Sequence, residues 1–62
     1  MKGTIKQCRT WQGMTQKELA EKVDVTVQTI CGWEKGTYTP SGKKLQEMAN
    51  VLGISADDII LP

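Results

Sequence analysis

The stretch TQKELAEKVDVTVQTICGWEKG, residues 15–36, decides the fold of this chain. It predicts two short helices joined by a tight turn. Thr15 and Glu18 have the spacing of a capping box, in which the hydroxyl accepts from the backbone N–H of residue 18 and the carboxylate accepts from that of residue 15. Thr26 is the expected cap of a second helix of about ten residues. The apolar residues that follow the helical period on the first helix are Leu19, Ala20 and Val23.

The second helix of this pair, residues 26–35, divides into two faces of different character. Ile30 and Trp33 share the face that is predicted to pack inward. The opposite face is formed by Val27, Gln28, Cys31, Gly32 and Lys35. It is poor in the Lys and Glu side chains that usually solvate an exposed helix, and Gly36 is the expected left-handed residue that ends the helix. We therefore expect a partner to lie against this face.

The order and spacing of these residues resemble the phage Cro and repressor class of helix-turn-helix DNA-binding domains. The resemblance covers nearly the whole chain, through the segments Ile5-Lys6-Gln7-Cys8-Arg9, Gly13-Met14-Thr15-Gln16, Leu19-Ala20, Ile30-Cys31-Gly32-Trp33-Glu34-Lys35-Gly36, Pro40-Ser41 and Leu52-Gly53-Ile54-Ser55. It implies that the first helix of the pair lies across the DNA backbone and that the second enters the major groove. It also implies a single helix-turn-helix domain over residues 1–62.

The segments on either side of this pair predict further helices. Residues 4–12 begin with the capping-box pattern of Thr4 and Gln7 and should end at Gly13. The cleanest helical period in the chain lies in residues 42–52, at Leu45, Met48, Ala49 and Leu52.

The end of the chain predicts one more helix, which makes the expected fold an all-α, compact five-helix domain. Ser55 and Asp58 are expected to cap this short fifth helix, which would carry Ala56, Ile59 and Ile60. The tail from Ile59 to Leu61 is more apolar than one packed face needs. It either completes the core or contributes to a dimer contact.

Length and composition bound the classes of function. A chain of 62 residues makes one small domain that buries only about 60% of its unfolded surface, so a buried catalytic cleft and an enzyme activity are not expected. Cys8 and Cys31 are the cysteines, and there is no histidine. The usual zinc ligand sets cannot be assembled from these residues, so we predict reduced thiols and no metal or cofactor. Cys8 is expected to be a small core residue, with a redox role as the alternative.

Charge and hydropathy indicate a cytoplasmic protein. Lys2, Lys6 and Arg9 interrupt the amino terminus, which argues against a signal peptide, and no run reaches the roughly 20 apolar residues of a membrane helix. No small-molecule ligand is evident. The formal net charge of +1 argues by itself against strong non-specific attraction to nucleic acid, although a neutral total can still contain a basic face.

Arg9 and Glu34 are predicted to form a structural ion pair. Glu34 lies near a helix C-terminus, where the helix dipole opposes a negative charge, and it follows the core residue Trp33. It should therefore pair with a cation. The family resemblance supplies that cation on the first helix of the chain, at Arg9.

The candidate base-reading residues lie on the outward face of residues 26–35 and are Val27, Gln28, Cys31 and Gly32. The Gln28 amide both donates and accepts, which suits N6 and N7 of adenine, and the Val27 methyls suit the thymine C5-methyl group. A glycine inside a helix lowers helix stability by about 1 kcal/mol relative to alanine. Gly32 either lets the helix lie close to DNA or is a neutral substitution that the fold tolerates. Because the family often carries a long polar residue there, DNA shape is expected to carry part of the specificity.

The candidate phosphate contacts fix register rather than sequence. The resemblance implies one of them at Gln16 and places the loop of residues 36–42 beside the DNA backbone, although an ordinary polar surface loop is the alternative. The full set of candidates is Gln16, Lys17, Thr26, Lys35, Thr37, Tyr38, Lys43 and Lys6.

These observations predict a sequence-specific regulator of transcription that binds double-stranded DNA. A domain this small offers few contacts, so we expect a homodimer on a palindromic operator, with repression by occlusion as the consequence. The alternative is an antitoxin or adaptor that uses the same helix face for a protein partner. Trp11 is expected to be partly buried against the turn after residues 4–12, or else to contact a partner.

Overall fold

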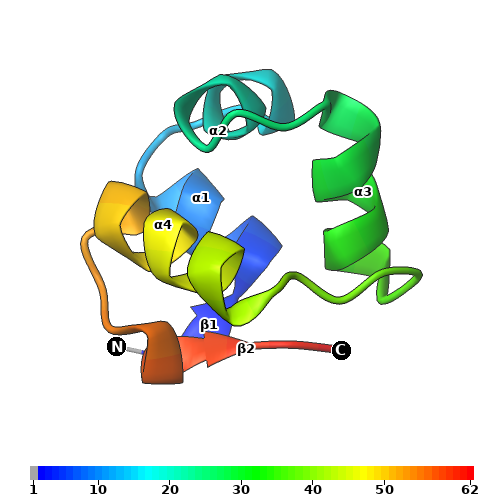
Figure 1. Ribbon diagram of the computed structural model, residues 1–62. Helices are drawn as coiled ribbons and strands as arrows, with labels where there is room; N and C mark the ends of the chain where they lie inside the picture. Colours follow the sequence, from blue (N-terminus) through cyan, green and yellow to red (C-terminus); the bar gives the residue numbers. More distant parts are fainter. Residues whose placement is uncertain (1) are drawn as a thin grey trace.

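The computed structural model describes residues 2–62, so Met1 of the predicted domain lies outside the described part of the chain. The described residues form four α-helices, one turn of 3-10 helix and two very short strands (Figure 1). In chain order these are β1 (Gly3–Thr4), α1 (Ile5–Trp11), α2 (Gln16–Lys22), α3 (Val27–Lys35), α4 (Gly42–Leu52), η1 (Ala56–Asp58) and β2 (Ile59–Ile60). None of the helices within this range is long and apolar enough to cross a membrane.

The helices begin where their capping residues predict. Thr4 Oγ1 accepts from the Gln7 N–H at 3.2 Å, and Gln7 Oε1 accepts from the Thr4 N–H at 2.9 Å. The second capping box closes with both bonds between Thr15 and Glu18 at 3.1 Å. Thr26 caps α3 by accepting from the backbone of residue 29 at 3.2 Å. Local sequence therefore sets the start of all three of these helices.

The core lies where the four helices meet. Leu19 and Ile30, from α2 and α3, are completely buried, as is Met48 from α4. The other core residues are Ile5, Cys8, Ala20, Val23, Trp33, Ala49, Leu52 and Ile59. The inward faces predicted for residues 15–36 and 42–52 are confirmed, with Leu45 only partly buried at the edge of the core. This packing fixes α3 at one side of the molecule (Figure 1).

The predicted fifth helix is wrong. Ser55 does cap a turn, by accepting from the Asp57 N–H at 3.3 Å, but the turn is a single 3-10 turn that ends at Asp58. The next two residues form β2, which pairs parallel to β1 with Gly3 opposite Ile59 and Thr4 opposite Ile60. Side chains alternate across a strand, so Ile59 is buried and Ile60 is half exposed, where a helix would have turned both inward.

Trp11 is partly buried, as expected, and packs against a segment that was not predicted. Its ring packs back over Gly3 in β1, where a Cβ on the glycine would lie 2.7 Å from Trp11 Cη2. The ring therefore covers Gly3 in β1, and about half of the residue stays exposed. A long side chain on a helix points back toward the N-terminus, which explains the direction of the ring.

Candidate nucleic-acid interface

The turn between α2 and α3 sets the orientation of the helix pair. Asp24 takes a left-handed conformation, with φ of 58°, which Asp tolerates better than most residues. The backbone reverses there, and the Val25 N–H donates to the Ala20 carbonyl at 2.9 Å. Together with the Thr26 cap, this geometry aims the first turn of α3 away from the core.

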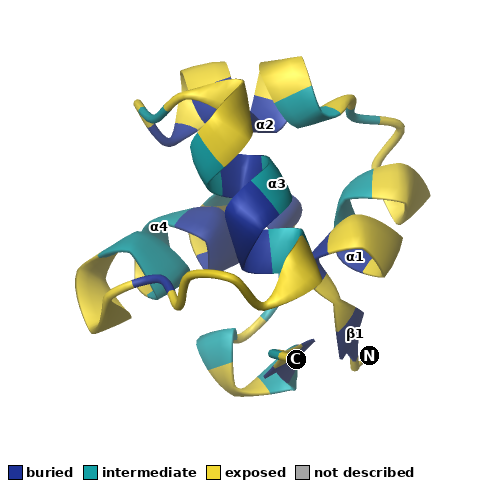
Figure 2. Ribbon diagram, turned by 90° about the vertical axis from the view of Figure 1, so that its right-hand side faces the viewer, coloured by how far each residue is buried: buried dark blue, intermediate teal, exposed yellow. Residues whose placement is uncertain are grey.

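The candidate base readers on the first turn of α3 are more exposed than the candidate one turn later. Val27 is 39% exposed, a large value for an apolar side chain, and Gln28 beside it is also exposed. Cys31, one turn later, is half-buried, and Lys35 at the end of the helix is exposed again. Figure 2 looks onto α3 and shows exposed residues at both ends with buried residues between them.

Gly32 lies on the same side of α3 as Gln28, but it is covered from solvent, whereas Val27 and Gln28 are exposed. The residue is buried, and the ring of Tyr38 from the following loop lies over it. A Cβ at this position would meet Tyr38 Cδ2 and Cε2, so the glycine makes room for the ring. The Gly32 carbonyl also accepts from the N–H groups of Thr37 at 2.9 Å and Tyr38 at 3.3 Å.

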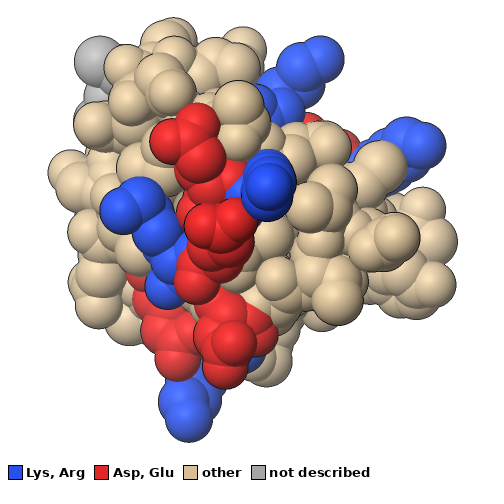
Figure 3. Space-filling model, turned by 90° about the horizontal axis from the view of Figure 1, so that it is seen from above, with Lys and Arg blue, Asp and Glu red and all other residues tan. Residues whose placement is uncertain are grey.

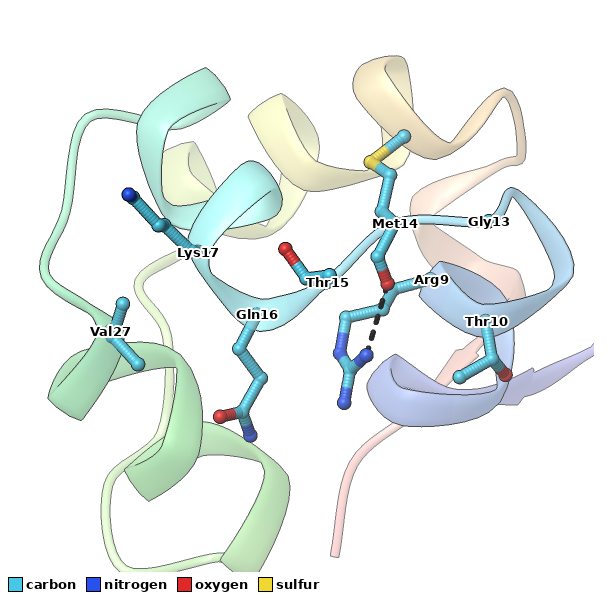
Figure 4. Close-up of a pocket in the computed structure, with 8 residues that line it drawn as sticks. All are labelled: Arg9, Thr10, Gly13, Met14, Thr15, Gln16, Lys17 and Val27. Carbon is cyan, nitrogen blue, oxygen red and sulfur yellow. Dashed lines mark hydrogen bonds between the residues drawn. The ribbon is translucent and has the colours of Figure 1, made fainter.

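The predicted ion pair between Arg9 and Glu34 is present. Arg9 donates from Nε to Glu34 Oε2 at 2.7 Å and from Nη2 to Oε1 at 3.3 Å. Arg9 Nη1 also donates to the Met14 carbonyl at 3.0 Å (Figure 4). The two charged side chains are only 11% and 7% exposed, so the pair is shielded from solvent. It ties the end of α3 to α1 and to the segment that enters α2.

Gln16, a candidate phosphate contact, belongs to the same network. Its Nε2 donates to Glu34 Oε1 at 3.1 Å, so the carboxylate holds the amide in place. Figure 4 shows the Gln16 side chain reaching from the first turn of α2 toward α3. The backbone N–H groups of a first helical turn have no acceptor within the helix. The first residue of α2, Gln16, therefore combines a backbone N–H with no acceptor in the helix and a side chain that Glu34 orients.

An open hollow on the surface joins the starts of α2 and α3. It is lined by Arg9, Thr10, Gly13, Met14, Thr15, Gln16, Lys17 and Val27 (Figure 4). Gln16 and Lys17 therefore border the same hollow as Val27. Predicted phosphate contacts and a predicted base contact meet on one surface.

The remaining phosphate candidates are on the surface but are not all gathered together. Lys6, Lys35 and Lys43 are exposed, as are Thr37 and Tyr38 in the loop. The Thr26 hydroxyl is partly occupied, since it caps α3 and shares a 2.9 Å hydrogen bond with the Thr29 hydroxyl. Seen from above α2, acidic side chains form a stripe with Lys or Arg side chains on both sides (Figure 3). This face therefore carries charges of both signs side by side.

The Cys8 thiol lies among core side chains. Cys8 is buried in the core, and this burial raises the pKa of its thiol above the ordinary value. A thiol that resists ionisation is a poor nucleophile and a poor metal ligand, as expected for a core cysteine. Among residues 2–62 no group of three or more His, Cys, Asp or Glu side chains is placed to hold a metal ion.

Comparison with known proteins places this arrangement in a family. The family model described as Helix-turn-helix matches residues 5–59. The chain belongs to the helix-turn-helix family of the Cro and repressor type. An uncharacterized HTH-type transcriptional regulator of Methanocaldococcus jannaschii is 39% identical over 61 residues, covering 98% of this chain and 92% of that relative. Another, from Methanothermobacter thermautotrophicus, is 47% identical over 53 residues, covering 86% of this chain and 77% of the relative.

A solved structure has the same fold. The crystal structure of SinR, the master regulator for biofilm formation, in complex with DNA matches with a TM-score of 0.78 and 35% sequence identity. The match covers 86% of each chain. In this helix-turn-helix domain α2 and α3 are the two helices joined by the tight turn at Asp24.

Several contacts of this helix-turn-helix domain were not predicted from the sequence, and two of them involve the helix pair directly. Lys44 Nζ donates to the Val23 carbonyl at 2.8 Å, which caps the end of α2 from α4. The ring of Tyr38 lies on Gly32. A glycine in the middle of an otherwise regular helix was the available signal for the second contact, because such a glycine often marks a close approach.

Proposed function

We propose that this chain regulates transcription by sequence-specific binding to double-stranded DNA, with α3 in the major groove. The main support is the exposed first turn of α3, where Val27 and Gln28 project from a helix whose opposite face is anchored by Ile30 and Trp33. A recognition helix needs both properties, an accessible N-terminal turn and a rigid seat. The likeness to DNA-bound SinR is consistent with this geometry.

Gln28 is the proposed principal reader of bases. Its amide suits the N6 donor and N7 acceptor of adenine, which it would contact together. Val27 would contact a thymine methyl group, and Cys31, half-buried one turn later, would make a weaker apolar contact. Side chains at the start of a recognition helix reach furthest into the groove, which favours residues 27 and 28 over residue 31.

The phosphate contacts would come from the elements around α3. Gln16 and Lys17 border the hollow beside Val27, and Gln16 is already oriented by its bond to Glu34. Lys35 lies at the other end of α3. Lys6, Lys43, Thr26, Thr37 and the hydroxyl of Tyr38 complete the proposed set. These contacts would supply affinity and its salt dependence, whereas α3 would supply sequence preference.

The domain would act as a dimer. Its base-reading surface is confined to a few side chains of one helix, so two copies on an inverted repeat would provide the specificity that one copy lacks. Half-sites about 34 Å apart would place both copies on the same side of the duplex. A dimer bound over a promoter would repress transcription by excluding polymerase.

A protein-binding module is the second candidate. The net charge of +1 and the short side chains of Val27 and Cys31 would also suit a protein partner, as in an antitoxin or adaptor. The salt dependence of the binding affinity distinguishes the DNA-binding candidate from the protein-binding one, since contacts to phosphates weaken steeply with added salt.

The test is selection of bound sequences from random duplex DNA by the purified chain, followed by affinity measurements at about 50 and about 200 mM salt. We expect an enriched inverted repeat and an affinity that falls strongly with salt. Absence of enrichment, with weak salt dependence, would contradict the proposed function and favour a protein partner for α3.

A further inference from the structure

We propose that Tyr38 is a specificity-determining residue. Gly32 gives α3 no side chain at position 32, and the ring of Tyr38, from the loop that follows, takes the place of that side chain. This inference rests on the proposed DNA-binding function and goes beyond it. It changes the role of Tyr38 from a phosphate contact through the hydroxyl to a base contact through the ring.

The contact between the ring and the helix is close and well supported. A Cβ on Gly32 would lie 2.9 Å from Tyr38 Cε2 and closer still to Cδ2, so only glycine leaves space for the ring here. The backbone reinforces the contact, since the Thr37 and Tyr38 N–H groups both donate to the Gly32 carbonyl. The left-handed Gly36, with φ of 84°, turns the chain back to make these bonds possible.

The ring lies on the helix without being buried by it. Tyr38 is 63% exposed, although one side of its ring covers Gly32. Position 32 is one helical turn after Gln28 and therefore on the same face of α3. The ring thus extends the proposed reading surface toward the end of the helix, where Gly32 by itself offers no side chain.

The chemistry of the ring suits an apolar feature of the major groove. The thymine C5-methyl group is the apolar group that base pairs present in the major groove, and apolar side chains recognise it by direct contact. An aromatic ring that rests on a helix offers such surface at low entropic cost, because the contact with Gly32 restricts the ring before DNA binds. A hydroxyl contact to phosphate, by contrast, would be equally strong on any sequence.

The DNA test compares Tyr38→Phe with Tyr38→Ala on the duplex selected by the unaltered chain and on random duplex of the same length. For each variant we compare the ratio of its affinity for the selected duplex to its affinity for random duplex. This ratio should fall about tenfold for Tyr38→Ala and stay within about twofold of the native value for Tyr38→Phe. Equal weakening on both duplexes, or equal effects of the two substitutions, would overturn the base-reading role. If the unaltered chain shows no salt-dependent binding, the proposed function fails and this assignment fails with it.

A second test uses the free protein and needs no DNA. The Hα resonances of Gly32 should be shifted by the ring current of Tyr38, and the shift should vanish in Tyr38→Ala. Gly32→Ala should displace the ring and lower the affinity ratio in the native chain but not in the Tyr38→Ala background. The matched control is Gly42→Ala at the start of α4, where a Cβ meets nothing within 4 Å. An unshifted Gly32 resonance, or additive effects of the two substitutions, would overturn the proposed pair.

Discussion

The two faces of α3 meet different surroundings although they belong to the same nine-residue helix. Ile30 and Trp33 are 0% and 5% exposed and pack into the core, whereas Val27 is 39% exposed on the other face. Residues on the buried face are constrained by their neighbours in the fold. Residues on the exposed face are free of that constraint and available to a partner. Stability and recognition should therefore depend on different residues of this one helix, and substitutions on each face can test this.

The largest expected effect is on the buried face. Ile30→Ala should lower the free energy of unfolding by about 2–5 kcal/mol, through lost burial and the cavity left behind. A chain of this length has a total free energy of unfolding of roughly 3–9 kcal/mol, so a large fraction of the Ile30→Ala molecules would be unfolded. Urea denaturation measures the loss. Val27→Ala is the matched control on the exposed face and should stay within about 0.5 kcal/mol of the native chain. Equal losses would show that the two faces are not distinct.

The next effect tests the ion pair that holds α3 to α1. Arg9→Met should cost about 3 kcal/mol in urea denaturation, because it leaves the Glu34 carboxylate buried without its cation. Glu47→Gln removes the more exposed pair with Lys44, whose side chains are 30% and 37% exposed, and should cost about 1 kcal/mol or less. A cost below about 1 kcal/mol for Arg9→Met would mean that solvent screens the pair after all.

On the exposed face the expected effect is on specificity. Gln28→Ala should weaken binding to the selected duplex by about 1–3 kcal/mol, with a much smaller loss on random duplex and no change in unfolding free energy. The affinities are measured by titration at one salt concentration. Gln46→Ala, a matched change on the exposed side of α4, should leave both affinities unchanged. Equal losses on the two duplexes would remove Gln28 from base reading.

The smallest expected effect is at the end of α3. Lys35→Ala should weaken binding to selected and random duplexes alike and reduce the slope of log affinity against log salt by about 0.9, the value for one phosphate contact. Lys22→Ala, on α2, is the matched control and should leave the slope unchanged. An unchanged slope in Lys35→Ala would place this lysine outside the interface.

Features set by neighbours in the sequence could be predicted. The capping boxes of Thr4 and Thr15 depend on residues three positions apart, and the inward faces of α3 and α4 follow the helical period. The ion pair of Arg9 and Glu34 joins distant residues, yet it was predicted because a carboxylate at a helix C-terminus needs a cation and the family resemblance indicated which one.

Features set by distant segments could not be predicted in this way. The pairing of β1 with β2 joins two residues at each end of the chain, and a two-residue strand has no period to recognise. Ile59 and Ile60 are consistent with a helix or a strand when read alone. The ring of Tyr38 reaches Gly32 through a loop, so the helical period placed the glycine on an exposed face that the loop covers.

The most direct test of the central claim is the change in backbone amide resonances when the isotope-labelled chain is titrated with its selected duplex. We expect the largest changes at Val27, Gln28 and Tyr38, with smaller ones at Gln16 and Lys17 and little change at Gln46 and Asn50 on the exposed side of α4. Changes centred on Trp11 and Ile60 instead, with α3 unaffected, would contradict the assignment of α3 as the recognition helix.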